Sequence, residues 1–393
     1  MKLVAVIASL LLSAHAWAGI APSSMQWMLQ AASYPVEEAA GGYLSDRSYF
    51  EIVTSNADQL VYVQVTTGST VTVVDWGDGN TATVSASSTI SNTYASADSY
   101  ELTVRGGCVS YKFGLGNAGE KALRTILTVF QGTPNLNSCN GQFVNAKFLT
   151  NAPLHLMTNQ SLVANIGGQF QECSAARGST PTYVYCPLLT TANNTFLNSA
   201  FQSTPYDAWT NSPFITALNG AYSTCGSMTG QIPTLVYNTN VTTYASFAIN
   251  SKFTISPPWD HITNNVKSVN CSKMYDGLTA LVGPIPALPP NASAIDEYIY
   301  GCTNAGFTGT VEMVFSVFIG TNCSDAERFA ASTVGYVRGL TGNGSFMTNR
   351  TWKSNFTFGP LSTNSSYRAL YRCSNLNDYT DLTMTNWTEY VAP

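Results

Sequence analysis

Two tryptophans are the residues whose spacing most clearly predicts a binding surface. Trp209 lies thirteen positions after Phe196, and Trp259 lies twelve positions after Phe247, so both occupy nearly the same place in a repeated unit. Flat aromatic side chains on a rigid support stack on sugar rings or contact a partner protein at low entropic cost. Hydrogen-bonding side chains adjoin them in the sequence: Tyr206, Asp207, Asp260 and His261. These six are the candidate ligand-binding residues, and the alternative is that the tryptophans cover the core where loops are long.

A second cluster has the residue types of a calcium loop. Asp75, Asp78 and Asn80 lie within one glycine-containing turn, and hard oxygen ligands suit calcium. The alternative, which we favour, is a turn whose side chains accept its own backbone N–H groups. We predict no other metal site and no cofactor.

Catalytic motifs are missing from the sequence. The chain has three histidines, and only His155 and His261 lie beyond the first eighteen residues. It contains no G-x-S-x-G, H-E-x-x-H, C-x-x-C or glycine-rich phosphate-binding motif. We therefore expect a protein that is not an enzyme. The alternative is a glycan-processing enzyme or its accessory subunit, with paired carboxylates drawn from Asp260, Asp276, Asp296 and Glu297.

The composition excludes one class of partner. Only 10 % of the 393 residues are charged, and 17 Lys and Arg against 22 Asp and Glu give a net charge of −5. A nucleic-acid partner requires clustered basic residues to displace counterions from phosphates, and the sequence has no basic run. An uncharged polar surface is typical of exported β-rich proteins.

The N-terminus predicts export. Lys2 precedes an apolar run over residues 3–12, and Ala16 and Ala18 flank Trp17 in the pattern that signal peptidase recognises. We expect cleavage after Ala18, a secreted or cell-surface protein, and a linker over residues 19–46. A run of ten apolar residues is too short to span a bilayer, and we expect no membrane-spanning segment.

Residues 47–107 predict a small β-sandwich of immunoglobulin type. Short β-branched or aromatic runs are separated by turn residues at 49–53, 60–66, 70–74, 81–84 and 100–104. Three segments, Val73–Gly79, Asn92–Ala95 and Ser99–Val104, resemble the PKD module with its W-G-D-G turn and final alternating strand. Asn92 departs from the family by replacing its usual histidine. The resemblance implies a spacer or binding module without catalytic residues, with Trp76 and Tyr94 in its core.

Residues 108–393 predict a solenoid of about nine or ten coils with an irregular C-terminal end. An apolar residue followed three positions later by a small one recurs at steps of twenty-five to twenty-seven positions. A unit of this length cannot bury its own apolar face and must stack on its neighbours. The predicted core anchors are Phe143, Phe170, Phe196, Tyr222, Phe247, Met274 and Ile299.

The repeat pattern, with its Phe-x-x-Cys and G-x-I-P elements, resembles the BspA-like leucine-rich repeats of bacterial surface proteins. Both G-x-I-P elements, Gly230–Pro233 and Gly283–Pro286, also occur in plant-type leucine-rich repeats, but the adjoining PKD-like segment favours the bacterial kind. The units are longer than the usual bacterial form, and most lack its leucines. The resemblance implies an extended repeat surface used in adhesion.

Cysteine placement follows the repeat. Cys173, Cys225 and Cys302 are separated by two and by three repeat units, which places them in one column. At about 4.8 Å per coil they are too far apart to pair, so we expect buried free thiols. One or two disulfides remain possible among the cysteines outside this column: Cys108, Cys139, Cys186, Cys271 and Cys323.

Eleven N-x-S/T sequons either carry glycans or, as we favour, arise from asparagines that bond the backbone between coils. They include Asn193, Asn240, Asn270, Asn291 and Asn386.

Together these patterns predict an all-β-dominated protein with a PKD-like sandwich and a leucine-rich-repeat solenoid. The expected function is non-catalytic binding of an extracellular protein or glycan. A structural component of an envelope or appendage is a further alternative.

Overall fold

The computed structural model describes residues 44–113, 122–304, 306–319, 323, 329–330 and 340–342. The predicted signal peptide, residues 19–43 of the linker and the predicted irregular end beyond residue 342 lie outside these residues. The described chain is β-rich, and its helix α4 (Val311–Val314) is a single short turn. No helix in the described part of the chain is long and apolar enough to cross a membrane.

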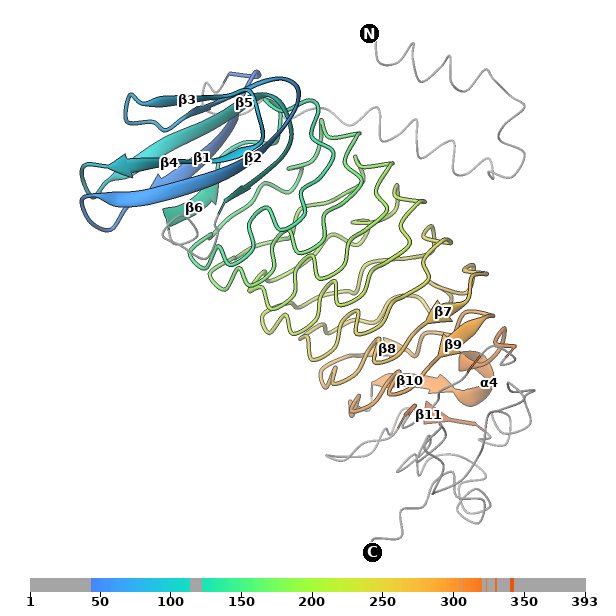
Figure 1. The fold of residues 1–393 in the computed structure, drawn as a ribbon. Helices are drawn as coiled ribbons and strands as arrows, with labels where there is room; N and C mark the ends of the chain where they lie inside the picture. The colour runs from blue at the N-terminus through green and yellow to red at the C-terminus, as the bar shows by residue number, and fades with distance from the viewer. Residues whose placement is uncertain are drawn as a thin grey trace, which may run out of the picture. The chain divides into compact units, whose positions relative to one another are not determined.

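The N-terminal part forms an antiparallel sheet of six strands in the order β3-β2-β5-β1-β6, with β4 paired to β2 (Figure 1). Alternate residues of these strands are buried, which matches the period-2 pattern of the sequence. The strands are β1 (Ser48–Val53), β2 (Gln59–Asp75), β3 (Thr81–Val84), β4 (Ser88–Tyr94), β5 (Ser99–Phe113) and β6 (Leu123–Ile126).

The two runs predicted at 60–66 and 70–74 form one long strand, β2. Its pairing with β5 shifts register between Thr67, which faces Cys108, and Thr72, which faces Gly106. The extra β2 residues form a bulge, and Val71 within it is 45 % exposed. The sequence pattern predicts two strands here because the bulge interrupts the alternation of buried and exposed residues without ending the strand.

The predicted core residues of the sheet are buried. Trp76 is 1 % and Tyr94 0 % exposed, and the Tyr94 hydroxyl donates a hydrogen bond of 2.9 Å to the Trp76 carbonyl. Gly77 has φ +80°, and a Cβ atom there would lie 2.6 Å from the Glu101 carbonyl oxygen. The turn after β2 therefore requires glycine both for its conformation and for its contact with β5.

The predicted boundary at residue 107 falls inside strand β5, which continues to Phe113. Beyond the boundary, β6 pairs with β1, and the Phe113 N–H donates to the Gln142 carbonyl at 2.8 Å. The Phe113 ring stacks on Phe143 with centroids 5.9 Å apart. The sheet and the first repeat units therefore share one hydrophobic core.

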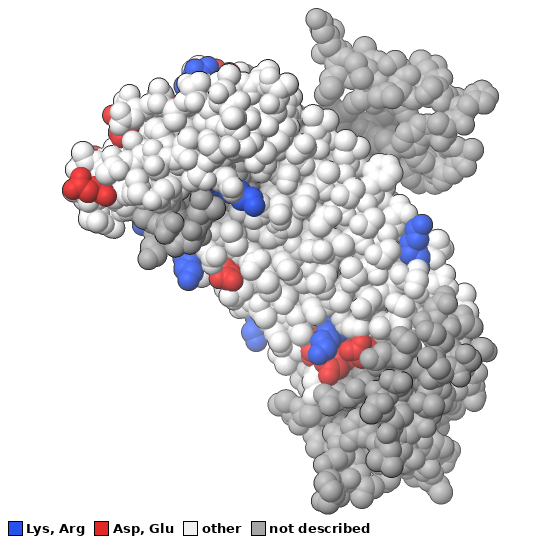
Figure 2. Space-filling model, viewed as in Figure 1, with Lys and Arg blue, Asp and Glu red and all other residues white. Residues whose placement is uncertain are grey.

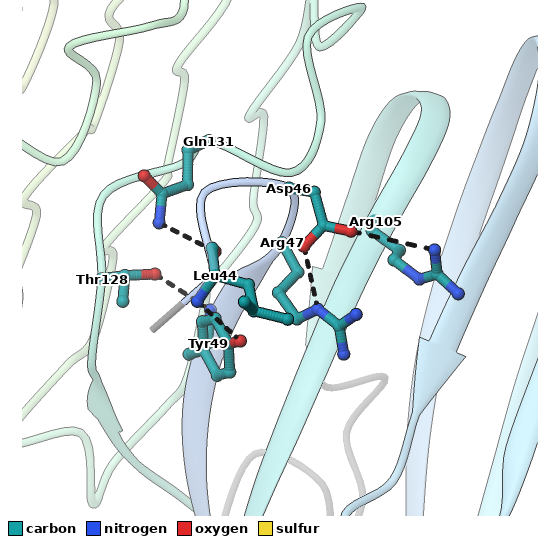
Figure 3. A network of polar contacts seen from close by, with 7 residues as sticks. All are labelled: Leu44, Asp46, Arg47, Tyr49, Arg105, Thr128 and Gln131. Atoms are coloured by element: carbon teal, nitrogen blue, oxygen red, sulfur yellow. Dashed lines mark hydrogen bonds and ion pairs between the residues drawn. The ribbon is translucent and has the colours of Figure 1, made fainter. Parts of the chain in front are cut away.

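Polar contacts fix the start of β1 to the segment that follows β6 (Figure 3). Gln131 Nε2 donates to the Leu44 carbonyl at 3.3 Å, and the Tyr49 N–H donates to Thr128 Oγ1 at 3.1 Å. Asp46 also pairs with Arg47 at 3.1 Å and, more weakly, with Arg105 at 3.9 Å. Surface ion pairs of this kind contribute little, and neither reaches the segment after β6, because Arg105 lies in β5. The hydrogen bonds therefore make the attachment to that segment.

After β6 the chain runs through successive turns that stack in parallel register, drawn green to orange in Figure 1. Single parallel bridges join equivalent positions of consecutive turns: Ser138 to Asn165, Asn165 to Thr191, Thr191 to Ala217, Ala217 to Thr243 and Thr243 to Asn270. Short parallel strands follow in two separate sheets. In the first, β7 (Val269–Asn270) pairs with β9 (Ala292–Ala294) and continues this ladder; in the second, β10 (Phe307–Thr310) lies between β8 (Gly283–Pro284) and β11 (Leu340–Thr341).

All seven predicted anchors are buried with 0 % exposure, and successive aromatic ones pack ring to ring. Centroid distances are 5.2 Å for Phe143–Phe170, 5.8 Å for Phe170–Phe196 and 5.2 Å for Phe196–Tyr222. Burial of the anchors, predicted from the repeat, is confirmed.

The backbone register nevertheless corrects two anchors. The N–H of each anchor bonds the carbonyl of the residue before the next one, as Phe170 does to Thr195. The Tyr222 N–H bonds the Phe247 carbonyl, so by this rule the next anchor is Ala248. The Ala248 N–H bonds the Met274 carbonyl, so the anchor after it is Tyr275. Phe247 and Met274 are therefore one residue out of register, because apolar residues on both sides of the position made the phase ambiguous.

The small residue three positions after the anchor has a defined role. The thiols of Cys173, Cys225 and Cys302 donate to the carbonyls of Phe143, Phe196 and Tyr275, at 3.3, 2.9 and 3.0 Å. Seven described cysteines are buried free thiols: Cys108, Cys139, Cys173, Cys186, Cys225, Cys271 and Cys302. The column residues are thus unpaired as predicted, and four of the five cysteines outside it form no disulfide.

Asparagine side chains bond neighbouring turns, which is the role we favoured for them over glycosylation. Asn240 Nδ2 donates to the Pro213 carbonyl at 2.9 Å, and Asn291 Nδ2 donates to the Val266 carbonyl at 2.8 Å. Asn193 Oδ1 accepts from the Asn219 N–H at 2.9 Å, whereas Asn270 bonds within its own turn. Asn386 lies outside the described residues.

Candidate binding groove

Trp209 is not part of an exposed surface, and the prediction that it forms a binding face is wrong. Its side chain is 0 % exposed, stacks on Tyr183 at 5.0 Å between centroids, and donates from Nε1 to the Tyr222 hydroxyl at 3.1 Å. The alternative that it covers the core is confirmed. Trp259 is 41 % exposed, so the two tryptophans do not form one face.

His261 is also unavailable for binding. Its side chain is 1 % exposed, and Nε2 contacts the Tyr275 hydroxyl inside the core. Burial lowers the pKa of His261 to about 3, because a charged imidazole loses its hydration there. Of the six predicted residues, Tyr206, Asp207, Trp259 and Asp260 are exposed.

The predicted calcium ligands are used within their own turn. Asp75 Oδ1 accepts from the Gly77 N–H at 3.1 Å, and Asp78 Oδ1 accepts from the Asn80 N–H at 3.0 Å. Asp78 Oδ2 accepts from the side-chain amides of Asn80 at 3.0 Å and Asn92 at 2.7 Å. Burial raises the pKa of Asp78, but these hydrogen bonds together outweigh it and hold the pKa below its ordinary value. The self-capped turn is the better description.

Three of the four predicted carboxylates lie near one another. Asp276 is affected by the charges of Glu297 and Asp296, and Lys273 pairs with Glu297 at 3.1 Å. Burial, together with the charge of Glu297, raises the pKa of Asp276 to about 7. Asp260 is not among the charges that act on Asp276. The described residues contain no group of three or more His, Cys, Asp or Glu side chains that could hold a metal ion.

The sequence reasoning missed a groove of about 300 Å³ that crosses three successive turns. Its lining is mostly amide, hydroxyl and glycine, with Val144 as the one apolar side chain. The lining residues are Asn140, Gly141, Val144, Asn165, Gly167, Gly168, Gln171, Thr191, Asn193 and Asn194.

The local conformation of the turns creates this groove. Gly141, Gly168 and Asn194 occupy one position in consecutive turns, two residues before the anchor, with φ of +61°, +61° and +55°. Only glycine, asparagine and a few other residues adopt this left-handed region readily. Two glycines in this column, together with Gly167, leave the hollow, and Asn194 ends it.

Backbone hydrogen bonds hold the asparagine side chains of the groove in place. Asn165 Oδ1 accepts from the Gly167 N–H at 2.9 Å, and Asn193 Oδ1 accepts from the Asn219 N–H. Within the described residues, the Nδ2 groups of Asn165 and Asn193 donate to no other protein atom. Each therefore keeps a fixed amide with two donors for a ligand.

The groove is electrically neutral. None of its ten lining residues is charged, and the described face seen in Figure 2 has only separate charged patches on an otherwise uncharged surface. The sequence feature that corresponds to the groove is the recurrence of Asn-Gly, Gly-Gly and Asn-Asn pairs at 140–141, 167–168 and 193–194.

A second surface feature is a column of exposed apolar side chains on consecutive turns. Leu162, Leu188 and Phe214 are 47, 46 and 48 % exposed and recur once in each turn. The residue after each of them is buried: Val163, Leu189 and Ile215. This alternation makes the outward column a regular consequence of the repeat.

Comparison with known proteins adds no family to this description: no protein-family model, no curated protein and no solved structure matches the chain.

Proposed function

We propose that the chain is an exported, non-catalytic binding or adhesion protein that presents the surface of stacked repeats to an extracellular protein or glycan. In this proposal, the turns form a solenoid of leucine-rich-repeat type and the N-terminal sheet is a PKD-like module. The observation that carries it is the neutral groove of fixed amides across three turns. Preorganised polar groups in a concave site bind with little loss of conformational entropy.

The rigidity of the turns supports this proposal. Each turn is bonded to the next through several backbone N–H groups and through column side chains such as Cys225 and Asn193. The exposed column at Leu162, Leu188 and Phe214 is a second surface, suited to a protein ligand.

The test is a screen of the purified chain, from residue 19 onward, on arrays of glycans and extracellular-matrix proteins. Retention of one ligand class supports the proposal. If the chain retains no ligand and assembles into ordered homo-oligomers instead, a structural component of an envelope or appendage replaces the binding role.

One observation favours a second candidate, a glycan-processing enzyme. A carboxyl with a pKa of about 7 beside a second carboxyl, as in Asp276 with Glu297, has the properties of a general acid. Incubation with glycan polymers tests this, with Asp276→Asn as the comparison. Release of reducing sugar by the parent chain and not by the variant would establish the enzyme in place of the binding protein.

A further inference from the structure

We propose that the groove around Gly168 binds a short stretch of a neutral glycan chain that lies along the stack of turns. This inference rests on the proposed binding function and names its ligand class and its site. It follows from the lining chemistry, the dimensions and the charge of the groove.

The lining chemistry matches the hydroxyl groups of sugars. A sugar hydroxyl both donates and accepts hydrogen bonds, and amide side chains offer both roles. The groove offers the Nδ2 group of Asn165 on one turn, and the Nδ2 group of Asn193 with the hydroxyl of Thr191 on the next. A peptide ligand would need apolar or charged pockets for its side chains, and Val144 is the single apolar lining residue.

The dimensions match a disaccharide-sized stretch of glycan. Neighbouring turns are about 4.8 Å apart, so three turns span about 10 Å along the stack. A volume of about 300 Å³ is at the small end of ligand sites, and the groove is open on its outer side. Glycine at 167 and 168 places no side chain in the groove, so that space stays open to a sugar ring.

The charge favours an uncharged sugar over an acidic one. The groove has no cationic lining residue to pair with a carboxylate or sulfate. Lys112 Nζ lies at the Gly141 end of the groove, 3.8 Å from where a Cβ would stand, and Glu172 follows Gln171 in the middle turn. These opposite charges lie outside the lining, so the groove itself discriminates by hydrogen bonding.

The structure provides a substitution that fills the groove at a small conformational cost, because asparagine adopts the left-handed region more readily than most residues. Gly168→Asn places an amide where the next turn already has Asn194 in the same left-handed conformation. The new Cβ would lie 3.3 Å from the flexible end of Gln171. The matched control is Gly178→Asn, at φ +70° with no heavy atom within 4 Å of the Cβ and outside the groove.

The experiment measures binding of the parent chain and both variants to neutral oligosaccharides, such as those of β-glucan, mannan and chitin, and to acidic ones such as heparin fragments. We expect neutral binding to fall by about tenfold or more in Gly168→Asn, because the added side chain occupies the groove, and to be unchanged in Gly178→Asn. Thermal unfolding of both variants verifies the fold. If Gly168→Asn does not fold, Gly141→Asn tests the same groove, because its nearest atoms would be 3.8 Å away.

The other outcomes separate the two proposals. Binding of proteins or acidic glycans alone overturns the neutral-glycan inference and leaves the binding function in place. Neutral binding that persists in a folded groove-filling variant overturns the assignment of the site. A chain that binds no oligosaccharide of either set and no protein on the extracellular-matrix array overturns both.

Discussion

At the scale of single residues, the column three positions after the anchors has a small hydrogen-bond donor in most turns, with Ala146 and Leu278 as the exceptions. Cys173, Cys225 and Cys302 donate from sulfur, and Ser251 in the same column donates from its hydroxyl to the Tyr222 carbonyl. Cysteine is therefore present for its size and its donor rather than for redox chemistry. Burial raises the pKa of Cys225 to about 12, which makes the thiol unreactive.

Replacing Cys225 tests this role. Cys225→Val should destabilise the protein by about 1 kcal/mol, because the buried Phe196 carbonyl loses its side-chain donor and keeps only the Ser199 N–H at 3.0 Å. Cys225→Ser should cost less, since serine occupies this position at Ser199 and Ser251. Urea unfolding of both variants measures the difference. A valine variant as stable as the serine variant would show that the column needs only volume.

The raised pKa of Asp276 predicts that the stability of the fold depends on pH. Its folded pKa of about 7 lies above the ordinary value of 3.8, so the folded state binds the proton more tightly. Stability should therefore fall as pH rises from about 4 and should level off above about 7. Asp276→Asn should remove this part of the dependence, as followed by melting temperature from about pH 4 to 8. The exposed Asp58→Asn is the control, and an equal effect of both substitutions would exclude Asp276 as the source.

At the scale of elements, each turn is shaped by two left-handed residues, two before and two after the anchor. The N–H of the later one bonds the following turn, as Asn198 does to Ser223 at 2.9 Å. This conformation lets consecutive turns stack without a continuous strand. For the turns from 139 to 301, φ lies between +51° and +72° in both columns, and the later column contains Asn145, Glu172, Asn198, Thr224, Asn250, Gly277 and Gly301.

Asn198, exposed and left-handed, tests how strongly the turn depends on this conformation. Asn198→Ala should cost about 1 kcal/mol, because a Cβ-bearing residue without a polar side chain disfavours positive φ. Asn198→Gly should be nearly neutral, since glycine is free of that penalty. Thermal unfolding distinguishes them. Equal melting temperatures for the alanine and glycine variants would show that the conformation at this position costs nothing.

At the scale of the whole described molecule, the sheet and the repeat units share a continuous core. Phe143, the first anchor, contacts the rings of Phe50 and Phe113 from the sheet and of Phe130 and Phe170 from the neighbouring segments. The sheet therefore covers the end of the repeat stack, a role that stacked repeats require of a terminal element.

Phe143→Ala tests this continuity. It should destabilise the protein by about 3–5 kcal/mol, the usual range for a large buried aromatic. Hydrogen exchange should show faster exchange both in β5 and in the first turns at 139–146. Unchanged protection in β5 would mean that the sheet is a separate domain, as the predicted boundary at 107 implied.

The sequence was sufficient for the β-rich fold, the repeat period and the burial of its anchors and column cysteines. A nearly constant repeat length places equivalent side chains on the same face of every turn, whatever the exact backbone path. The self-capped turn at Asp75 and Asp78 was also predictable, because its hydrogen bonds are local.

Only the tertiary structure determined which side chains reach solvent. Trp209 is buried because Tyr183 and Tyr222 pack on it from neighbouring turns, and no local pattern contains that contact. The register at Ala248 and Tyr275, the passage of β5 through residue 107 and the groove at Gly168 depend likewise on how one turn aligns with the next. Burial and cavity shape are properties of contacts between residues far apart in the chain, so composition and spacing alone leave them undetermined.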